Sequence, residues 1–217
     1  MGCQGLCLAA YPADPDRLLA AGYIQSGNNT YMGIFLSTNG GTNWTQVKIM
    51  NENGTTADAA AVAPSSVNTI YVAGGDSSGD HYYFYRSANG GAAWTQVAAP
   101  STSSDVTGLA VHPSLPTTLY AATSWAGVFK STDGGSSWTE LDKAPDSGNC
   151  VVVNPSNPNE VFVGSSDGIE YSADGGATWT DLSAGLAAKN VVWIEIDGPA
   201  RLVYAGIESG GICRRSF

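Results

Sequence analysis

An eight-residue segment occurs four times in this chain and restricts the architecture that the sequence can adopt. From Trp44 to Trp94, Trp138 and Trp179 the steps along the chain are 50, 44 and 41 residues. A repeat of this length predicts stacked supersecondary units rather than one irregular domain. Each copy reads Ser-x-Asn/Asp-Gly-Gly-x-x-Trp, with the shared positions Ser37, Asn39, Gly41 and Trp44; Ser87, Asn89, Gly91 and Trp94; Ser131, Asp133, Gly135 and Trp138; and Ser172, Asp174, Gly176 and Trp179.

The residue types of the repeat suit a tight hairpin turn. The Asn or Asp side chain can accept hydrogen bonds from backbone N–H groups two residues on. The two glycines can adopt a positive φ without steric cost. The serine hydroxyl can bond the turn from its other side, and the indole can fill the space beside the hairpin. We therefore expect the repeat to be structural rather than catalytic.

This pattern resembles the Asp-box, or bacterial neuraminidase repeat, of β-propeller proteins. The resemblance covers almost the whole chain, and the nearest look-alikes are propellers of the xyloglucanase and sortilin types. It implies that the four turns lie away from the ligand-binding face. Proteins with this fold include enzymes, receptors and assembly factors, so the resemblance does not by itself assign a function.

A second pattern separates the turns and defines the strands. An apolar run ends at a proline, and an aromatic or leucine strand follows at a nearly constant distance; the prolines are Pro12, Pro64, Pro113, Pro155 and Pro199. Each unit therefore has four strands, called A to D here: the run before the proline, the strand after it, and the strands that enter and leave the turn. Four-stranded antiparallel sheets repeated around an axis form a propeller.

The sequence thus predicts an all-β fold, a β-propeller of four-stranded antiparallel blades with four full blades and a partial fifth. The blades span about 5–50, 57–98, 105–143, 148–184 and 190–217 of a single unit, 1–217. Small residues stand five positions before four of the prolines, which favours strand A as the innermost strand. Two interpretations of the partial blade stay open: a five-bladed ring with a three-stranded last blade, or a piece of a larger propeller whose remaining blades lie in another chain or domain.

Composition excludes several classes of partner. The chain has 9 Lys and Arg against 19 Asp and Glu, for a net charge of −10, which argues against nucleic-acid binding. No stretch reaches the 18 or more apolar residues of a membrane span, so we expect no membrane insertion. The first residues lack the basic and apolar regions of a signal peptide. We expect an extracellular or periplasmic protein whose signal was removed or lies in a larger parent.

The four cysteines, Cys3, Cys7, Cys150 and Cys213, are too far apart for a paired zinc-binding motif. They are either structural thiols or include a disulfide from Cys213 to Cys3 or Cys7. Only two histidines occur, and they are distant in sequence, so we expect neither a metal site nor a cofactor.

The face opposite the four turns is where loop length varies, and binding residues gather on variable loops of a rigid scaffold. Strands B and C are joined by long loops in the first two blades, 24–32 and 75–82, and by short ones in the next two. Exposed aromatic rings beside polar groups suit sugar rings, so this face predicts a glycan or protein partner. The candidate ligand-binding residues are Tyr31, Asp80, His81, Tyr82 and Trp125.

Two hydrolase families with this fold provide tests. Sialidases need an arginine cluster and a Phe/Tyr-Arg-Ile-Pro motif, and this chain has only five arginines and lacks the motif. Xyloglucan hydrolases carry a Leu-Tyr-Ala-x-Thr-Asp pattern whose Asp takes part in hydrolysis, but Ser124 stands at that position here. Asp167 and Glu208 offer carboxylates on neighbouring blades, as an inverting glycosidase requires.

Two functional hypotheses follow. The first is a non-catalytic, extracytoplasmic binding or scaffolding propeller for a glycan or protein partner. The alternative is a fragment of a xyloglucanase-like glycoside hydrolase with paired carboxylates at Asp167 and Glu208. A photosynthetic assembly factor is a third, weaker possibility, because the arginine-rich patch of such proteins is absent.

Overall fold

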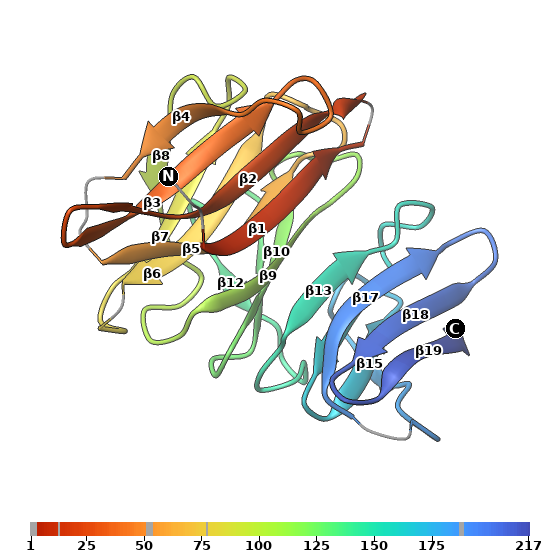
Figure 1. The fold of residues 1–217 in the computed structure, drawn as a ribbon. Helices are drawn as coiled ribbons and strands as arrows, with labels where there is room; N and C mark the ends of the chain where they lie inside the picture. Colours follow the sequence, from red (N-terminus) through yellow and green to blue (C-terminus); the bar gives the residue numbers. More distant parts are fainter. Residues whose placement is uncertain (1–3, 13, 51–53, 77, 187–188) are drawn as a thin grey trace.

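The computed structural model describes residues 4–12, 14–50, 54–76, 78–186 and 189–217. Within these ranges the chain forms nineteen strands in five antiparallel sheets and contains no helix, so no described helix could cross a membrane. Figure 1 shows the sheets in chain order, from the red first sheet to the blue fifth. The prediction of an all-β propeller with four full blades and a partial fifth is confirmed.

Four sheets have four strands in sequence order, and the last sheet has three. The first two blades contain β1 (Gln4–Tyr11), β2 (Asp14–Ser26), β3 (Asn29–Ser37) and β4 (Thr45–Ile49), then β5 (Thr55–Val62), β6 (Ile70–Asp76), β7 (Tyr82–Ser87) and β8 (Thr95–Val97). The next two contain β9 (Val106–Val111), β10 (Leu119–Thr123), β11 (Val128–Ser131) and β12 (Thr139–Glu140), then β13 (Cys150–Val153), β14 (Val161–Ser165), β15 (Gly168–Ser172) and β16 (Thr180–Asp181). The fifth contains β17 (Val191–Asp197), β18 (Leu202–Ile207) and β19 (Gly211–Ser216).

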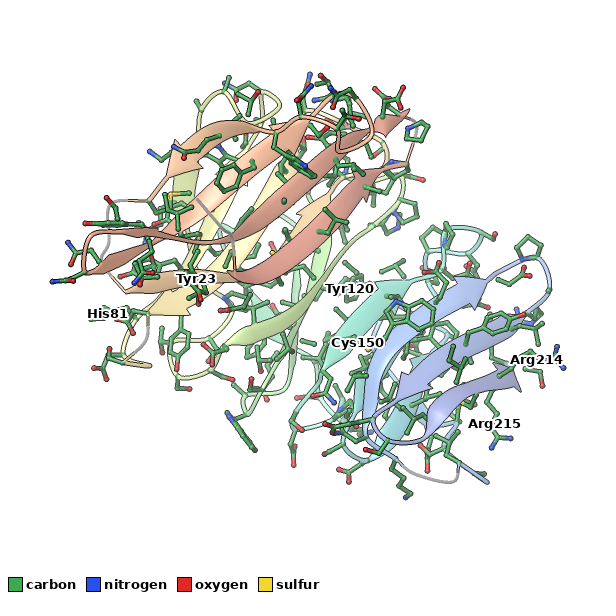
Figure 2. The ribbon with its side chains drawn as sticks, viewed as in Figure 1. Tyr23, His81, Tyr120, Cys150, Arg214 and Arg215 are labelled. Carbon is green, nitrogen blue, oxygen red and sulfur yellow. The ribbon has the colours of Figure 1, made fainter. Side chains whose placement is uncertain are left out.

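The first strand of each blade is the innermost, as predicted. β1 packs on β5, β5 on β9, β9 on β13, and β13 on β17. Close approach at the centre requires small side chains there: a Cβ added to Gly108 of β9 would lie 3.0 Å from the Cys150 backbone of β13. Figure 2 shows Cys150 near the centre of the molecule.

The two ends of the blades differ in their connections. In each full blade, the first glycine of the Gly-Gly turn donates its N–H to a carbonyl of the turn between strands A and B, for example Gly134 to Thr117 at 2.8 Å and Gly175 to Asn159 at 2.8 Å. These two kinds of turn therefore share one end of the propeller, which we call the corner rim. The B–C turns and the D–A connections lie at the other end, which we call the loop rim.

All four corners have the same hydrogen bonds. In the third blade the Ser131 hydroxyl donates to Asp133 Oδ1 (2.9 Å) and accepts from the Gly135 N–H (2.9 Å). The Asp133 carboxylate also accepts the backbone N–H of Ser137 (2.9 Å). This donor lies four residues on rather than the two we expected, because the side chain spans the whole turn. The Ser137 hydroxyl donates a further bond to the Asp133 carboxylate. This bond, followed by the others, lowers the pKa of Asp133 to about 2.

The corner tryptophans lie between blades rather than only beside their own hairpin. The Trp138 ring meets Phe84 of the preceding blade edge-on, with centroids 5.2 Å apart, and its Nε1 donates to Ala98 O at 2.9 Å. Trp94 and Trp179 likewise pack against the apolar clusters of the blades before them. Trp44, in the first blade, is 39% exposed.

Three cysteines lie in described positions with free thiols, which are Cys7, Cys150 and Cys213. The possible disulfide between Cys7 and Cys213 is therefore wrong, and Cys3 lies outside the described residues. Burial raises the pKa of the Cys7 thiol to about 12 and that of Cys150 to about 11. Both thiols stay protonated at neutral pH.

Candidate functional site

The loop rim is tied together by hydrogen bonds between B–C turns and D–A connections. Ser124 N donates to Asp105 O (3.0 Å), and Trp125 N donates to the Ser104 hydroxyl (2.9 Å). In the fifth blade, Glu208 N donates to Asn190 O (2.9 Å). In the third and fifth blades the B–C turn is thus held by the chain segment that enters the inner strand of the same blade.

In the first blade the expected loop 24–32 is instead a regular hairpin, so this prediction is wrong. β2 and β3 remain paired up to Ser26 and Asn29, and Gly27 begins the two-residue turn with φ of +64°. The strands continue because the residues between Ile24 and Met32 can pair in register, whereas polar content alone suggested a loop. Tyr31 lies on this hairpin, and its hydroxyl accepts a bond from Asn29 Nδ2 at 3.0 Å.

In the second blade the loop after β6 folds around Asp76. One of its carboxylate oxygens accepts bonds from the Ser78 hydroxyl (2.8 Å) and the Asp80 N–H (3.1 Å), and the other lies 2.7 Å from His81 Nδ1. The bond from Ser78, together with the bonds from Asp80 and His81, holds the pKa of Asp76 below its usual range. The Tyr82 hydroxyl donates to Gly79 O at 2.9 Å. These bonds shape the loop that carries Asp80, His81 and Tyr82, and Figure 2 shows His81 at the edge of the molecule.

In the third blade Trp125 is the most exposed large apolar residue of the described chain, at 83%. It stands beside a cleft of about 730 Å³. The cleft is lined by hydroxyls and carboxylates as well as by the ring, including Ser101, Thr102, Ser103, Glu140 and Asp146. An aromatic platform beside such groups can hold a sugar ring by its face and by its hydroxyls.

A second pocket, of about 570 Å³, lies where the inner strands meet at the loop rim. We call it the axial pocket, and all five blades contribute to it, through Cys7, Ala57, Asp58, Asp105, Val106, Thr107, Asn149 and Val192. The segment 101–107 lines both this pocket and the Trp125 cleft. The two hollows are therefore neighbours on one rim.

Two carboxylates, those of Asp58 and Asp105, line the axial pocket. Asp105 Oδ1 lies 3.0 Å from the position that a Cβ on residue 75 would take. Asp58 is exposed at the mouth of the pocket, but the surrounding protein removes enough water from its carboxylate to raise its pKa to about 6, and the charge of Asp105 adds to the rise. Bonds from the Thr56 hydroxyl and the Gly75 backbone act in the opposite direction. Asp58 can therefore carry a proton in mildly acidic solution.

Sequence reasoning missed Asp58 and Asp105, although a signal was present for Asp58. Asp58, Thr107 and Asn149 each stand six residues before the proline of their blade. The polar residues at this position all line the axial pocket. The sequence patterns indicated the loops between strands B and C instead.

The two carboxylates predicted from sequence have separate surroundings. Asp167 is exposed, and its N–H donates to the Ser165 hydroxyl at 3.1 Å. Glu208 is exposed and accepts a bond from Asn190 Nδ2, while Asn149 Nδ2 donates to Asn190 Oδ1 at 2.8 Å. Glu208 is therefore linked through two amides to the axial pocket. In the described residues, no group of three or more His, Cys, Asp or Glu could hold a metal ion.

The known proteins that this chain resembles are a probable xyloglucanase and GH74 enzymes. A probable oligoxyloglucan-reducing end-specific xyloglucanase of Neosartorya fischeri is 29% identical over 129 residues, covering 53% of this chain and 16% of the relative. The crystal structure of an ancestral GH74 enzyme matches 94% of this chain and 28% of its own, with a TM-score of 0.64 and 25% identity. The GH74 enzyme of Niastella koreensis matches 97% of this chain and 45% of its own, with a TM-score of 0.58 and 20% identity.

These matches support a relationship to xyloglucanase and GH74 propellers. No family model matches the sequence, so the Asp-box resemblance remains a prediction at the level of the family. The chain spans less than half the length of each of the three relatives. The activities of the whole relatives are therefore only a proposal for this chain.

Proposed function

We propose that this chain is the glycan-binding portion of a xyloglucanase-like glycoside hydrolase, with its loop rim in contact with a β-glucan chain. The observation that carries this proposal is the exposed Trp125 ring beside a cleft lined by hydroxyls and carboxylates. An indole that is 83% exposed adds little to the stability of the fold, and its place beside a polar cleft favours a role in binding. The similarity to a probable xyloglucanase supports the choice of polysaccharide.

The similarity to these enzymes favours the enzymatic alternative over a purely scaffolding role. Both hypotheses share the glycan ligand and the loop rim. They differ in whether a bond is broken. We also propose that the protein acts outside the cytoplasm, where such a polysaccharide would be encountered.

Hydrolysis is the second candidate function, and the axial pocket favours it. A protonated Asp58 would donate its proton to the glycosidic oxygen as the bond to the anomeric carbon breaks. The Asp105 side chain would take a proton from the water that attacks that carbon, so the net reaction adds one water. Asp167 and Glu208 remain the pair proposed from sequence, and Glu208 reaches the same pocket through Asn190 and Asn149.

Binding is tested by calorimetry with xyloglucan oligosaccharides and with cellohexaose. We expect Trp125→Ala to weaken binding about tenfold, because the ring supplies the main apolar contact. Trp193→Ala is the matched control, since Trp193 is also exposed, at 47%, but does not line the cleft. Equal affinities for wild type and Trp125→Ala would contradict the proposal.

Hydrolysis is tested by release of reducing ends from xyloglucan. Asp58→Asn and Asp105→Asn should remove the activity if the axial pair is catalytic, whereas Asp167→Asn and Glu208→Gln should do so if the sequence-based pair is. Binding without turnover in the wild-type chain would leave the binding role and exclude catalysis by this chain alone.

A further inference from the structure

The turn that carries Trp125 has a hydrogen bond at every backbone N–H. It joins β10 to β11 and consists of residues 124–127. The Ser124 N–H donates to Asp105 O (3.0 Å), and the Gly127 N–H donates to Asp146 O (2.8 Å). Side-chain hydroxyls accept the two N–H groups between them. The backbone under the exposed indole is therefore held by protein groups along its whole length.

The two hydroxyls that complete this set are buried. The Trp125 N–H donates to the Ser104 hydroxyl (2.9 Å), and the Ala126 N–H donates to the Thr123 hydroxyl (3.0 Å). Ser104 is 1% exposed and Thr123 is completely buried. Removal of a buried acceptor leaves its donor without a partner, which is unfavourable unless the segment rearranges. Loss of either hydroxyl should therefore loosen the turn.

Ser104 differs from its neighbours in the connection that enters β9. Residues 101–103 line the Trp125 cleft, and residues 105–107 line the axial pocket. Ser104 lies between these two groups and lines neither hollow. Among the described residues, the one hydrogen bond of its side chain leads to Trp125. Ser104 therefore has no contact with a ligand in either hollow, but it is bonded directly to the residue that carries the ring.

A ring fixed before binding needs less ordering when the ligand arrives. At 83% exposure the Trp125 indole has little packing against the protein, so its direction depends on the backbone beneath it and on two side-chain dihedral angles. Ordering a loop during binding has an entropic cost that lowers the affinity. The bonded turn removes the backbone part of that cost.

The fourth blade contains a similar bond far from the cleft. The Ser183 hydroxyl accepts the Ile169 N–H at 3.0 Å, and Ser183 is 4% exposed. Neither residue lines the Trp125 cleft or the axial pocket. Ser183 and Ser104 thus make the same kind of bond at comparable burial, and they differ in what the bonded N–H carries.

We propose that Ser104 is a positioning residue for glycan binding. Its hydroxyl holds the Trp125 backbone so that the indole stands beside the cleft before a sugar ring arrives. This inference rests on the proposed function, because Ser104 acts on the ligand only through Trp125. It assigns a binding role to a buried side chain that the ligand does not touch.

Hydrogen exchange of the Trp125 backbone amide tests the hold without any ligand. We expect Ser104→Ala to speed this exchange about tenfold, because the N–H loses its acceptor. Ser183→Ala is the matched control and should leave the exchange of the Trp125 amide unchanged. Equal exchange of that amide in wild type and Ser104→Ala would overturn the inference.

Calorimetry with xyloglucan oligosaccharides tests the consequence for binding. We expect Ser104→Ala to weaken binding about fivefold through the lost preorganisation, and Ser183→Ala to leave it unchanged. In a chain that already carries Trp125→Ala, the Ser104→Ala change should have no further effect. This lack of additivity separates positioning of the ring from a general structural role, which would weaken binding in both backgrounds.

The outcomes distinguish this inference from the proposed function. Equal affinities of wild type and Trp125→Ala would contradict the proposed function itself. A weakened Trp125→Ala together with wild-type affinity in Ser104→Ala would overturn the positioning role alone. An equal loss from Ser104→Ala with and without the Trp125 ring would also overturn it.

Discussion

The corner rim and the loop rim are built from the same five sheets, yet they use polar side chains in opposite ways. At the corner rim, the carboxylates of Asp133 and Asp174 accept hydrogen bonds from their own turns, and these bonds lower the pKa of each to about 2. At the loop rim, the exposed Asp58 lines a pocket whose walls remove part of the water around its carboxylate and raise its pKa to about 6. Repeated bonds thus maintain the fold, and the carboxylates left over at the other rim are available for a ligand.

The largest effect on stability should come from a corner tryptophan. Trp138→Ala removes a ring that packs on Phe84 and a bond to Ala98 O. We expect the free energy of unfolding to fall by about 3 kcal/mol. Urea denaturation measures it, with Trp125→Ala as the matched tryptophan at the loop rim. A loss of less than about 0.5 kcal/mol in Trp138→Ala would break the distinction between the rims.

The second largest effect should come from Glu160, which joins the last two blades at the corner rim. Its buried carboxylate accepts bonds from Asn154 Nδ2 (2.6 Å) and from Arg201 Nη1 (3.0 Å). Burial opposes ionisation, but these bonds outweigh it and lower the pKa of Glu160. Glu160→Ala should cost about 2 kcal/mol at pH 7. Because the pKa is lowered, the contribution should fade as the pH drops below the usual range of a glutamate, and a loss independent of pH would contradict this account.

A smaller effect should come from a corner serine. The Ser172 hydroxyl is buried and bonds both Asp174 Oδ1 and the Gly176 N–H, each at 2.8 Å. Ser172→Ala leaves that N–H without its acceptor, so we expect a loss of about 1.5 kcal/mol. Ser136→Ala, at an exposed corner position, serves as the control and should change stability little. Equal losses in the two variants would show that the repeated serine has no special role.

At the loop rim, Asp58→Asn should stabilise the protein, and only at neutral or higher pH. The folded pKa lies above the unfolded value, so ionisation of Asp58 lowers stability as the pH rises through about 6. The gain at pH 7.5 should be at most about 1 kcal/mol, because solvent at the pocket mouth screens the charge. At pH 4 the two proteins should be equally stable. Denaturation at both pH values checks this, and a gain of the same size at pH 4 would contradict a raised pKa.

The sequence was sufficient for the architecture because the blade is a local unit. The spacing of Trp44, Trp94, Trp138 and Trp179 and the recurring prolines report on turns formed within a few residues, and the structure has the same sheets. The site depends on contacts between blades. Asp58 and Asp105 are 47 positions apart and meet only because the inner strands converge at the axis.

One local expectation failed for a physical reason, and another was incomplete. The polar segment around Gly27 was expected to be a loop, but its strands continue to pair up to a two-residue turn. The corner tryptophans fill the space beside the hairpin as expected, and Trp138 also bonds to a carbonyl of the preceding blade, which the repeat alone did not indicate. Neither the length of a hairpin nor the partner of a ring follows from repeat spacing alone.

The most direct measurement is a crossed comparison of two tryptophan variants in calorimetry with xyloglucan oligosaccharides and in urea denaturation. We expect Trp125→Ala to weaken binding about tenfold and to change the free energy of unfolding by less than about 0.5 kcal/mol. Trp138→Ala should lower that free energy by about 3 kcal/mol and leave the affinity within about twofold. If Trp138→Ala weakened binding as much as Trp125→Ala did under conditions where both proteins are folded, the division of roles between the two rims would be wrong.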